Sequence, residues 1–109
     1  MNLAGLMLVR NEEWILGASL RAALSWCDSV VIMDHASTDR TLDIIGDVKR
    51  EIGGGRLLIY HWPDASRWDE MTQRQRLLDM GHSVGATHFG MVDADERLLR
   101  RLKRDIIER

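Results

Sequence analysis

The stretch that decides the fold spans residues 29 to 55 and reads SVVIMDHASTDRTLDIIGDVKREIGGG. It opens with Ser29 to Met33, a run that is nearly all β-branched or apolar, as in a buried strand. From about Arg40 to Ile52, apolar residues recur at spacings of three and four, which is the period of an amphipathic helix (Leu42, Ile45, Val48 and Ile52). The glycine run that follows stops the helix. This stretch therefore predicts one strand–loop–helix unit of a βαβ fold.

The same alternation continues on both sides of this unit. We expect further strands at Leu3–Val9, Leu57–Tyr60 and His88–Val92, and helices at Glu12–Trp26, Asp69–Val84 and Glu96–Ile107. Strands that alternate with helices are typical of an α/β fold with a mostly parallel sheet, here of about four strands with helices on both faces. The 109 residues leave room for one domain, spanning residues 1–109.

Composition narrows the class of partner. The formal net charge of −2 gives no electrostatic reason to expect nucleic acid or an anionic membrane as a partner. No apolar stretch approaches the roughly 20 residues needed to cross a bilayer, and the apolar start lacks the features of a secretory signal. A single cysteine, Cys27, excludes a disulfide within the chain and favours a reducing compartment. We therefore expect a cytoplasmic protein, or one peripheral to the inner face of the membrane.

Three loops that leave predicted strands carry unusual chemistry. They are Arg10-Asn11-Glu12-Glu13, the segment from Asp34 to Thr41, and Asp93-Ala94-Asp95-Glu96. In an open parallel sheet, ligands bind outside the carboxyl ends of the strands, where these loops lie. The sequence therefore predicts a binding site at this edge.

Helix capping is the alternative explanation of these loops, because Asn, Ser, Thr and Asp are all good N-caps (here Asn11, Ser37, Thr38, Asp39 and Asp95). A cap needs one oxygen, whereas the fourth-strand loop offers three carboxylates in four residues. Crowded carboxylates resist ionisation unless a cation or hydrogen-bond donors offset their charge. A hard divalent cation that bridges to phosphate oxygens would offset it.

Four segments together resemble glycosyltransferase family 2, a family with the GT-A fold. Val9-Arg10-Asn11-Glu12-Glu13 resembles its opening loop, and residues 31–41 resemble its Asp-x-x-Ser-Thr-Asp-Gly-Thr segment. Residues 72–77 (TQRQRL) fall where the family often has an Arg-Asn pair, and residues 88–96 (HFGMVDADE) resemble its Asp-x-Asp strand end. The sequence departs from the pattern at His35, where many members have a second acidic residue, at Arg40 for glycine and at Gln75 for asparagine.

The resemblance implies a Rossmann-like nucleotide-binding half and a set of site residues. Residues expected to contact the nucleotide sugar are Val9, Arg10, Asn11, Glu12, Asp34, His35, Ser37, Arg74, Asp93 and Ala94. Arg74 would reach the diphosphate, since guanidinium groups suit paired phosphate oxygens; the alternative is a solvated charge on its helix. Asp95, with Asp93, would hold Mn²⁺ or Mg²⁺ against the diphosphate.

Only the donor half of the family is represented. The implied reaction transfers a sugar from a nucleotide-diphosphate donor to an acceptor hydroxyl, but the acceptor and the catalytic base are unknown from this chain. We therefore expect a missing C-terminal half, or a short form that pairs with another chain or self-associates.

Three other functions are weaker matches. A sugar nucleotidyltransferase would have a glycine-rich loop after the first strand, and a dinucleotide-binding oxidoreductase a Gly-x-Gly-x-x-Gly motif, but this loop has no glycine. A non-catalytic module that keeps the GT-A fold is the third.

Packing is the main role that we expect for the tryptophans and the cysteine. We expect Trp14 and Trp26 on the first helix in the core or an interface, and Trp62 and Trp68 either packed or stacked on a ligand. Cys27 is expected to be an inert small apolar residue.

Overall fold

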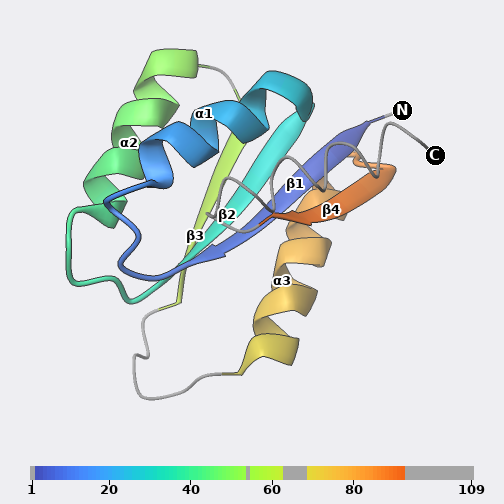
Figure 1. Cartoon of the computed structure of the whole chain (residues 1–109). Helices are drawn as coiled ribbons and strands as arrows, with labels where there is room; N and C mark the ends of the chain where they lie inside the picture. Colours follow the sequence, from blue (N-terminus) through green and yellow to red (C-terminus); the bar gives the residue numbers. More distant parts are fainter. Residues whose placement is uncertain (1, 54, 63–68, 93–109) are drawn as a thin grey trace.

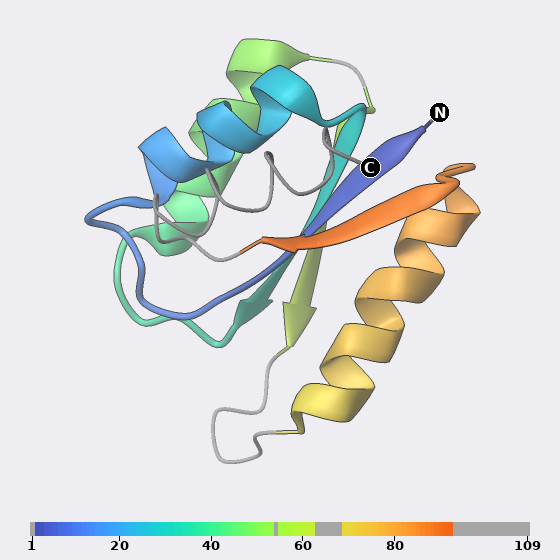
Figure 2. The ribbon, with the colours of Figure 1, turned by 45° about the vertical axis from the view of Figure 1, so that its right-hand side comes forward.

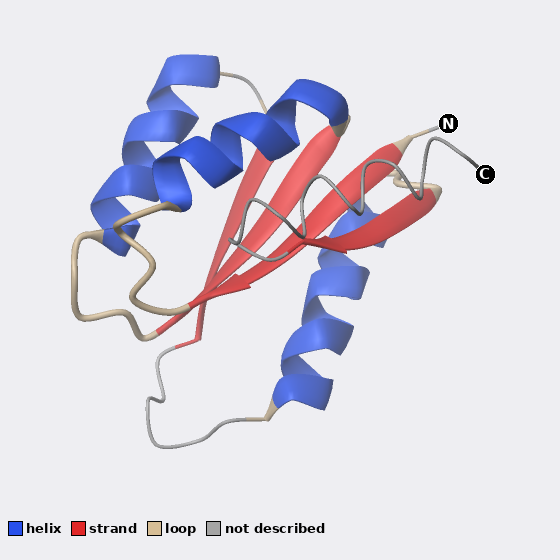
Figure 3. Cartoon of the chain, in the orientation of Figure 1, coloured by secondary structure: helices blue, strands red, loops and turns tan. Residues whose placement is uncertain are grey.

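A computed structural model describes residues 2–53, 55–62 and 69–92 (Figures 1 and 3). The elements follow in the order β1 (Leu3–Val9), α1 (Leu16–Trp26), β2 (Ser29–His35), α2 (Thr41–Ile52), β3 (Leu57–Trp62), α3 (Glu70–Ser83) and β4 (His88–Val92). The strand–helix alternation predicted from the sequence is confirmed for all seven. The helix expected at Glu96–Ile107 lies outside the described residues.

The four strands form one parallel sheet in the order β3-β2-β1-β4. Strand β1 is central: Val9 pairs with Asp34 of β2, and Met7 pairs with Val92 of β4. At the far side of β2, His35 pairs with Trp62 of β3. Because all strands run the same way, their carboxyl ends share one edge of the sheet. The expected α/β fold with a parallel sheet is confirmed.

Successive side chains of each strand point to opposite faces of the sheet and form two cores, one on each face. Figure 2 shows α1 and α2 covering one face and α3 the other. The core under α1 and α2 includes Leu20, Ile32 and Ile45, and the core under α3 includes Leu6, Met33 and Leu77. Strand β2 is buried along its whole length, which is why its sequence is continuously apolar from Val30 to Met33.

Glycine brings α3 close to β4. A Cβ at Gly81 would lie 2.6 Å from Cε1 of Phe89, so this contact admits no larger residue without a shift. Gly81 and Phe89 thus fix how α3 packs on the sheet edge.

Two apolar residues lie outside the core, although the sequence pattern was compatible with burial; for Trp14 the expectation of an interface stays untested. Trp14 precedes α1 and is 78% exposed, so it is not a core residue of that helix. Leu42 is 38% exposed, although its spacing matched the buried Ile45 and Val48 of α2. Trp26, by contrast, is on α1 and packs partly against the core.

Cys27 is buried at the end of α1, as expected of a small apolar residue. Desolvation, together with the charge of Asp28, raises the pKa of the Cys27 thiol to about 11. A neutral thiol is a poor nucleophile, so Cys27 acts as core volume. Within the described residues, none of the helices combines the length and the apolar character needed to cross a bilayer.

Candidate functional site

The chain path marks one place on the sheet edge for a ligand. Helices α1 and α2 follow β1 and β2 on one face, whereas α3 leads from β3 to β4 on the opposite face. The direction of winding therefore reverses between β1 and β4, which are neighbours in the sheet. Ligands of open α/β sheets bind outside the carboxyl ends of the strands at such a switch point. The loop after β1 flanks this point, and β4 ends there at Val92, the last residue that the structure describes.

The loop after β1 begins with a left-handed residue. Asn11 has φ of 51°, a conformation that Asn tolerates better than most residues. The chain then forms a turn in which the N–H groups of Ile15 and Leu16 donate to the Glu12 carbonyl at 3.2 and 2.9 Å. Helix α1 therefore starts at Leu16 instead of Glu12, and Asn11 is not its N-cap, which was the capping alternative.

Asn11 instead joins this loop to the loop after β2. Its Oδ1 accepts from the backbone N–H of Thr38 at 2.8 Å and that of Asp39 at 3.3 Å. In return, the N–H of Asn11 donates to Oγ of Ser37 at 2.9 Å. Figures 1 and 2 show the two loops side by side beyond the sheet edge. We refer to this set of bonds between residues 11–13 and 37–41 as the loop clamp.

The other half of the loop clamp is centred on Asp39 and Thr41. The N–H of Glu12 donates to Oγ1 of Thr41 at 3.0 Å, and that of Glu13 to Asp39 at 3.3 Å. The Asp39 carboxylate also accepts from the N–H and hydroxyl of Thr41. Desolvation alone would raise the pKa of Asp39, but the hydrogen bonds from Thr41 and Glu13 outweigh it and lower the pKa.

Asp39 thereby satisfies an N–H at the start of α2, as the capping alternative proposed for this loop. The N-cap position itself is Arg40, which makes no side-chain cap bond.

Asp34 is buried at the end of β2, with 2% of its surface exposed. Its carboxylate accepts from the N–H of Ser37 at 3.2 Å and from the Ser37 hydroxyl. Ala36 between them has φ of 49°, which is strained for alanine. The bonds between Asp34 and Ser37 thus hold the second loop in shape. Oγ of Ser37 in turn accepts the hydrogen bond from the N–H of Asn11.

His35 lies on the opposite face from Asp34, because neighbouring strand residues point to opposite sides. It is fully buried, and its Nδ1 lies 3.2 Å from Nε2 of Gln73 on α3. Gln73 is itself fully buried, and its Oε1 has no partner in the described part of the chain. A glutamine in a polar helix start gave no sequence signal for burial, so Gln73 was missed.

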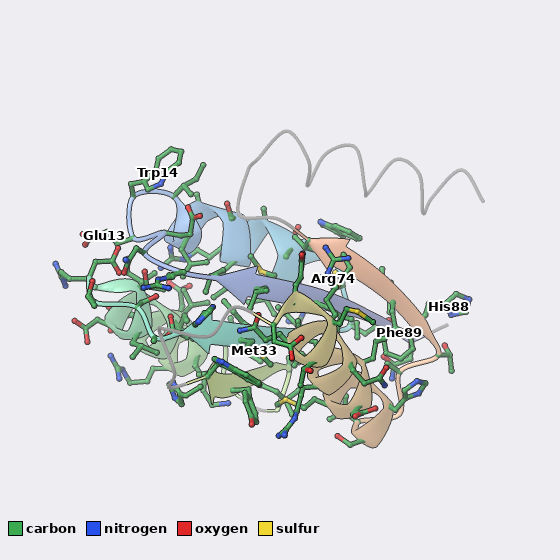
Figure 4. All side chains as sticks on the ribbon, turned by 90° about the horizontal axis from the view of Figure 1, so that it is seen from below. Glu13, Trp14, Met33, Arg74, His88 and Phe89 are labelled. Atoms are coloured by element: carbon green, nitrogen blue, oxygen red, sulfur yellow. The ribbon has the colours of Figure 1, made fainter. Side chains whose placement is uncertain are left out.

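Arg74 lies on α3, on the side of the sheet away from the loop clamp. Its side chain is 54% exposed and forms an ion pair with Glu70 one turn earlier, at 2.6 Å. Figure 4 shows Arg74 on α3, well apart from Glu13 and Trp14, which precede α1. Arg74 is thus a half-exposed charge on its helix, and its contact with a diphosphate stays a prediction.

The remaining predicted residues divide into three groups. Arg10 is exposed and Glu12 half-buried on the first loop, while the Val9 side chain is in the core. Asp93, Ala94 and Asp95 follow β4 directly in the sequence and lie outside the described residues. Among the residues in ranges 2–53, 55–62 and 69–92, no cluster of three or more His, Cys, Asp or Glu side chains could hold a metal.

Comparison with known proteins gives no independent assignment. No protein-family model matches the chain, and a search of curated proteins found no match.

Proposed function

We propose that this chain binds the nucleoside-diphosphate part of a sugar donor in a glycosyltransferase similar to family 2. The observation that carries the proposal is the topology: β1 and β4 are adjacent at the switch point of a parallel sheet. The loop Arg10-Asn11-Glu12-Glu13 leaves one of these strands, and Asp93-Ala94-Asp95 follows the other in the sequence. The two most specific motifs of the sequence therefore belong to the two strands that flank the expected crevice.

The loop clamp supports the same proposal. Enzymes hold a charged ligand best with groups whose positions are fixed before binding. Here the bonds of Asn11, Asp39 and Thr41 fix both loops against each other at the strand ends. The same residues that define the motif therefore act first as the frame of the site.

In the proposed reaction, an acceptor hydroxyl attacks the anomeric carbon of the donor sugar and the nucleoside diphosphate leaves. This chain would hold the leaving group, and a divalent cation bound through Asp93 and Asp95 would offset its negative charge. The described residues supply the nucleoside side of the site through the first two loops.

Calorimetric titration of UDP, and then of GDP, tests the proposal in the presence of Mn²⁺ and again with EDTA. We expect binding that requires the metal and is lost in Asp95→Ala. The matched control is Asp47→Ala, which removes an exposed carboxylate of α2 that pairs with Arg50. Absence of binding by either nucleotide to the folded protein would overturn the proposal.

One observation favours a second candidate, a non-catalytic module that keeps this fold. Several residues expected to contact the nucleotide have structural partners instead: Asp34 with Ser37, His35 with Gln73, and Arg74 with Glu70. A module of this kind would be folded to the same extent but would bind no nucleotide in the same titration.

A further inference from the structure

Asn11 contributes only one end of its side-chain amide to the loop clamp. Its Oδ1 accepts from the N–H groups of Thr38 and Asp39 at 2.8 and 3.3 Å, and it lies 3.5 Å from the Thr38 hydroxyl. Turning the amide round would set its NH2 group against two N–H donors, so the loop clamp permits one orientation of the amide. The Oδ1 atom is therefore committed to the fold, and the NH2 group points away from these donors.

The NH2 group is the part of Asn11 that remains for a ligand. Asn11 is exposed, and within residues 2–53, 55–62 and 69–92 its NH2 group makes no hydrogen bond. The backbone is fixed as well, since the N–H of Asn11 donates to Oγ of Ser37 at 2.9 Å. A donor whose position is fixed before binding costs little entropy when a ligand accepts from it.

The two polar residues that end β2 are not available to a ligand beside Asn11. Asp34 is 2% exposed, and both of its carboxylate oxygens accept from Ser37. His35 points to the opposite face of the sheet, where it is fully buried beside Gln73. Recognition at this point of the edge therefore falls to the first loop.

The charge of the two loops indicates which part of a nucleotide the Asn11 donor meets. Residues 10–13 and 34–41 carry four carboxylates and two guanidinium groups. The Asp39 carboxylate belongs to the loop clamp itself, where it accepts from the N–H of Glu13 at 3.3 Å. An excess of negative charge disfavours a phosphate here and favours an uncharged acceptor. In a nucleotide, such acceptors are the carbonyl oxygens of the base and the hydroxyl groups of the ribose.

We propose that the Asn11 NH2 group donates to an uncharged acceptor oxygen of the donor nucleoside, while Oδ1 of the same amide holds the loop clamp. This inference rests on the proposed function, which puts the nucleoside at the first two loops. It adds which atom of Asn11 makes the contact, and it assigns that contact to the nucleoside and not to the diphosphate.

NMR of the side-chain NH2 signals tests the contact directly. The chain has one other asparagine, Asn2, which precedes β1 at the opposite edge of the sheet, and the Asn11 signal is assigned by its loss in Asn11→Asp. The probes are UDP, GDP and pyrophosphate, each titrated with Mg²⁺. We expect at least one nucleotide to shift the Asn11 signal saturably, while pyrophosphate leaves it unchanged and the Asn2 signal stays in place. The 2′,3′-dideoxy analogue of that nucleotide then distinguishes a ribose hydroxyl from a base carbonyl.

Asn11→Asp separates the two roles of the side chain. It keeps an oxygen for the N–H groups of Thr38 and Asp39, but it replaces the NH2 donor by a second, negatively charged acceptor. We expect a urea midpoint close to that of the unmodified chain, and a nucleotide affinity at least tenfold weaker. The control Gln75→Glu adds the same charge at an exposed position of α3 and should leave the affinity unchanged.

The failure of this inference is distinguishable from that of the proposed function. If a nucleotide binds without moving the Asn11 signal, or binds Asn11→Asp as tightly as the unmodified chain, the inference is wrong and the donor site stands. If pyrophosphate shifts the signal as the nucleotide does, Asn11 meets the diphosphate and the inference is again wrong. If neither nucleotide binds, the proposed function is wrong and the inference falls with it. The NMR shift is measured on the unmodified chain, so it decides the question even where Asn11→Asp is destabilised.

Discussion

Asn11 should stabilise the loop clamp in two separable ways, through its side-chain acceptor and through its backbone conformation. In Asn11→Ala the acceptor is lost, and the left-handed backbone conformation becomes strained. In Asn11→Gly the acceptor is lost, but the left-handed conformation at φ of 51° is relieved of any side-chain clash. The pair of variants therefore separates the hydrogen bonds from the backbone strain.

The magnitudes follow from the geometry. The strongest bond, from Thr38 N–H to Asn11 Oδ1 at 2.8 Å, is exposed and should contribute about 1 kcal/mol net. The weaker bonds at 3.3 and 3.5 Å are more easily replaced by water. Alanine in the left-handed region costs about a further 1 kcal/mol. We therefore expect Asn11→Ala to lower the free energy of unfolding by about 2 kcal/mol and Asn11→Gly by about 1 kcal/mol.

Urea denaturation followed by circular dichroism measures both variants against the unmodified chain. With a slope typical of a small domain, a loss of about 2 kcal/mol lowers the midpoint by roughly 1 M. Equal destabilisation by alanine and glycine would refute the role of the backbone conformation. No change in either variant would show that the loop clamp does not stabilise the fold.

Three further predictions concern single positions. Gly81→Ala should destabilise the protein by about 1–3 kcal/mol, because the added Cβ meets the Phe89 ring. Gly46→Ala, whose Cβ would have room, should instead stabilise α2 by up to about 1 kcal/mol. Thermal unfolding compares the two variants, and equal shifts of the melting temperature would contradict the packing at Gly81. Ala36→Gly should raise the free energy of unfolding by about 0.5 kcal/mol, because glycine removes the strain of the left-handed conformation at φ of 49°. Urea denaturation should show a higher midpoint, and a lower one would count against that strain. The fold lowers the pKa of Asp39, so its ionised carboxylate stabilises the protein at any pH above the pKa of an ordinary carboxyl group. This stability is lost as the pH falls through the lowered pKa of Asp39. The stability difference between the unmodified chain and Asp39→Asn should therefore shrink from about pH 6 to about pH 3, and a constant difference would refute it.

The sequence predicted the strands and helices well because burial dictates their composition. Strand β2 is buried on both faces, and its run from Val30 to Met33 is accordingly apolar. Its last two residues, Asp34 and His35, were assigned to a loop, because a polar residue gives no signal of the buried partner that tolerates it. Leu42 shows the converse limit, since helical spacing alone does not tell where the covered face ends.

The sequence predicted which loops meet at the candidate site, but not the contacts that their residues make. The loops after β1 and β2 do meet at the carboxyl edge, as parallel strands require. That Asn11 bonds to the second loop instead of capping α1 depends on a contact across 27 residues, which local patterns do not reveal. Gln73 was missed for the same reason, because its partner His35 is 38 residues away.

The most direct test of the proposed donor site is to map nucleotide contacts on the backbone. Amide NMR shifts are recorded during titration of UDP, and then of GDP, with Mg²⁺. If the switch point between β1 and β4 binds the nucleotide, the amides of residues 10–13 and 36–39 should shift most, while those at the carboxyl end of α2 stay unchanged. Shifts confined to other surfaces, or no shifts with either nucleotide, would contradict a donor site in this chain.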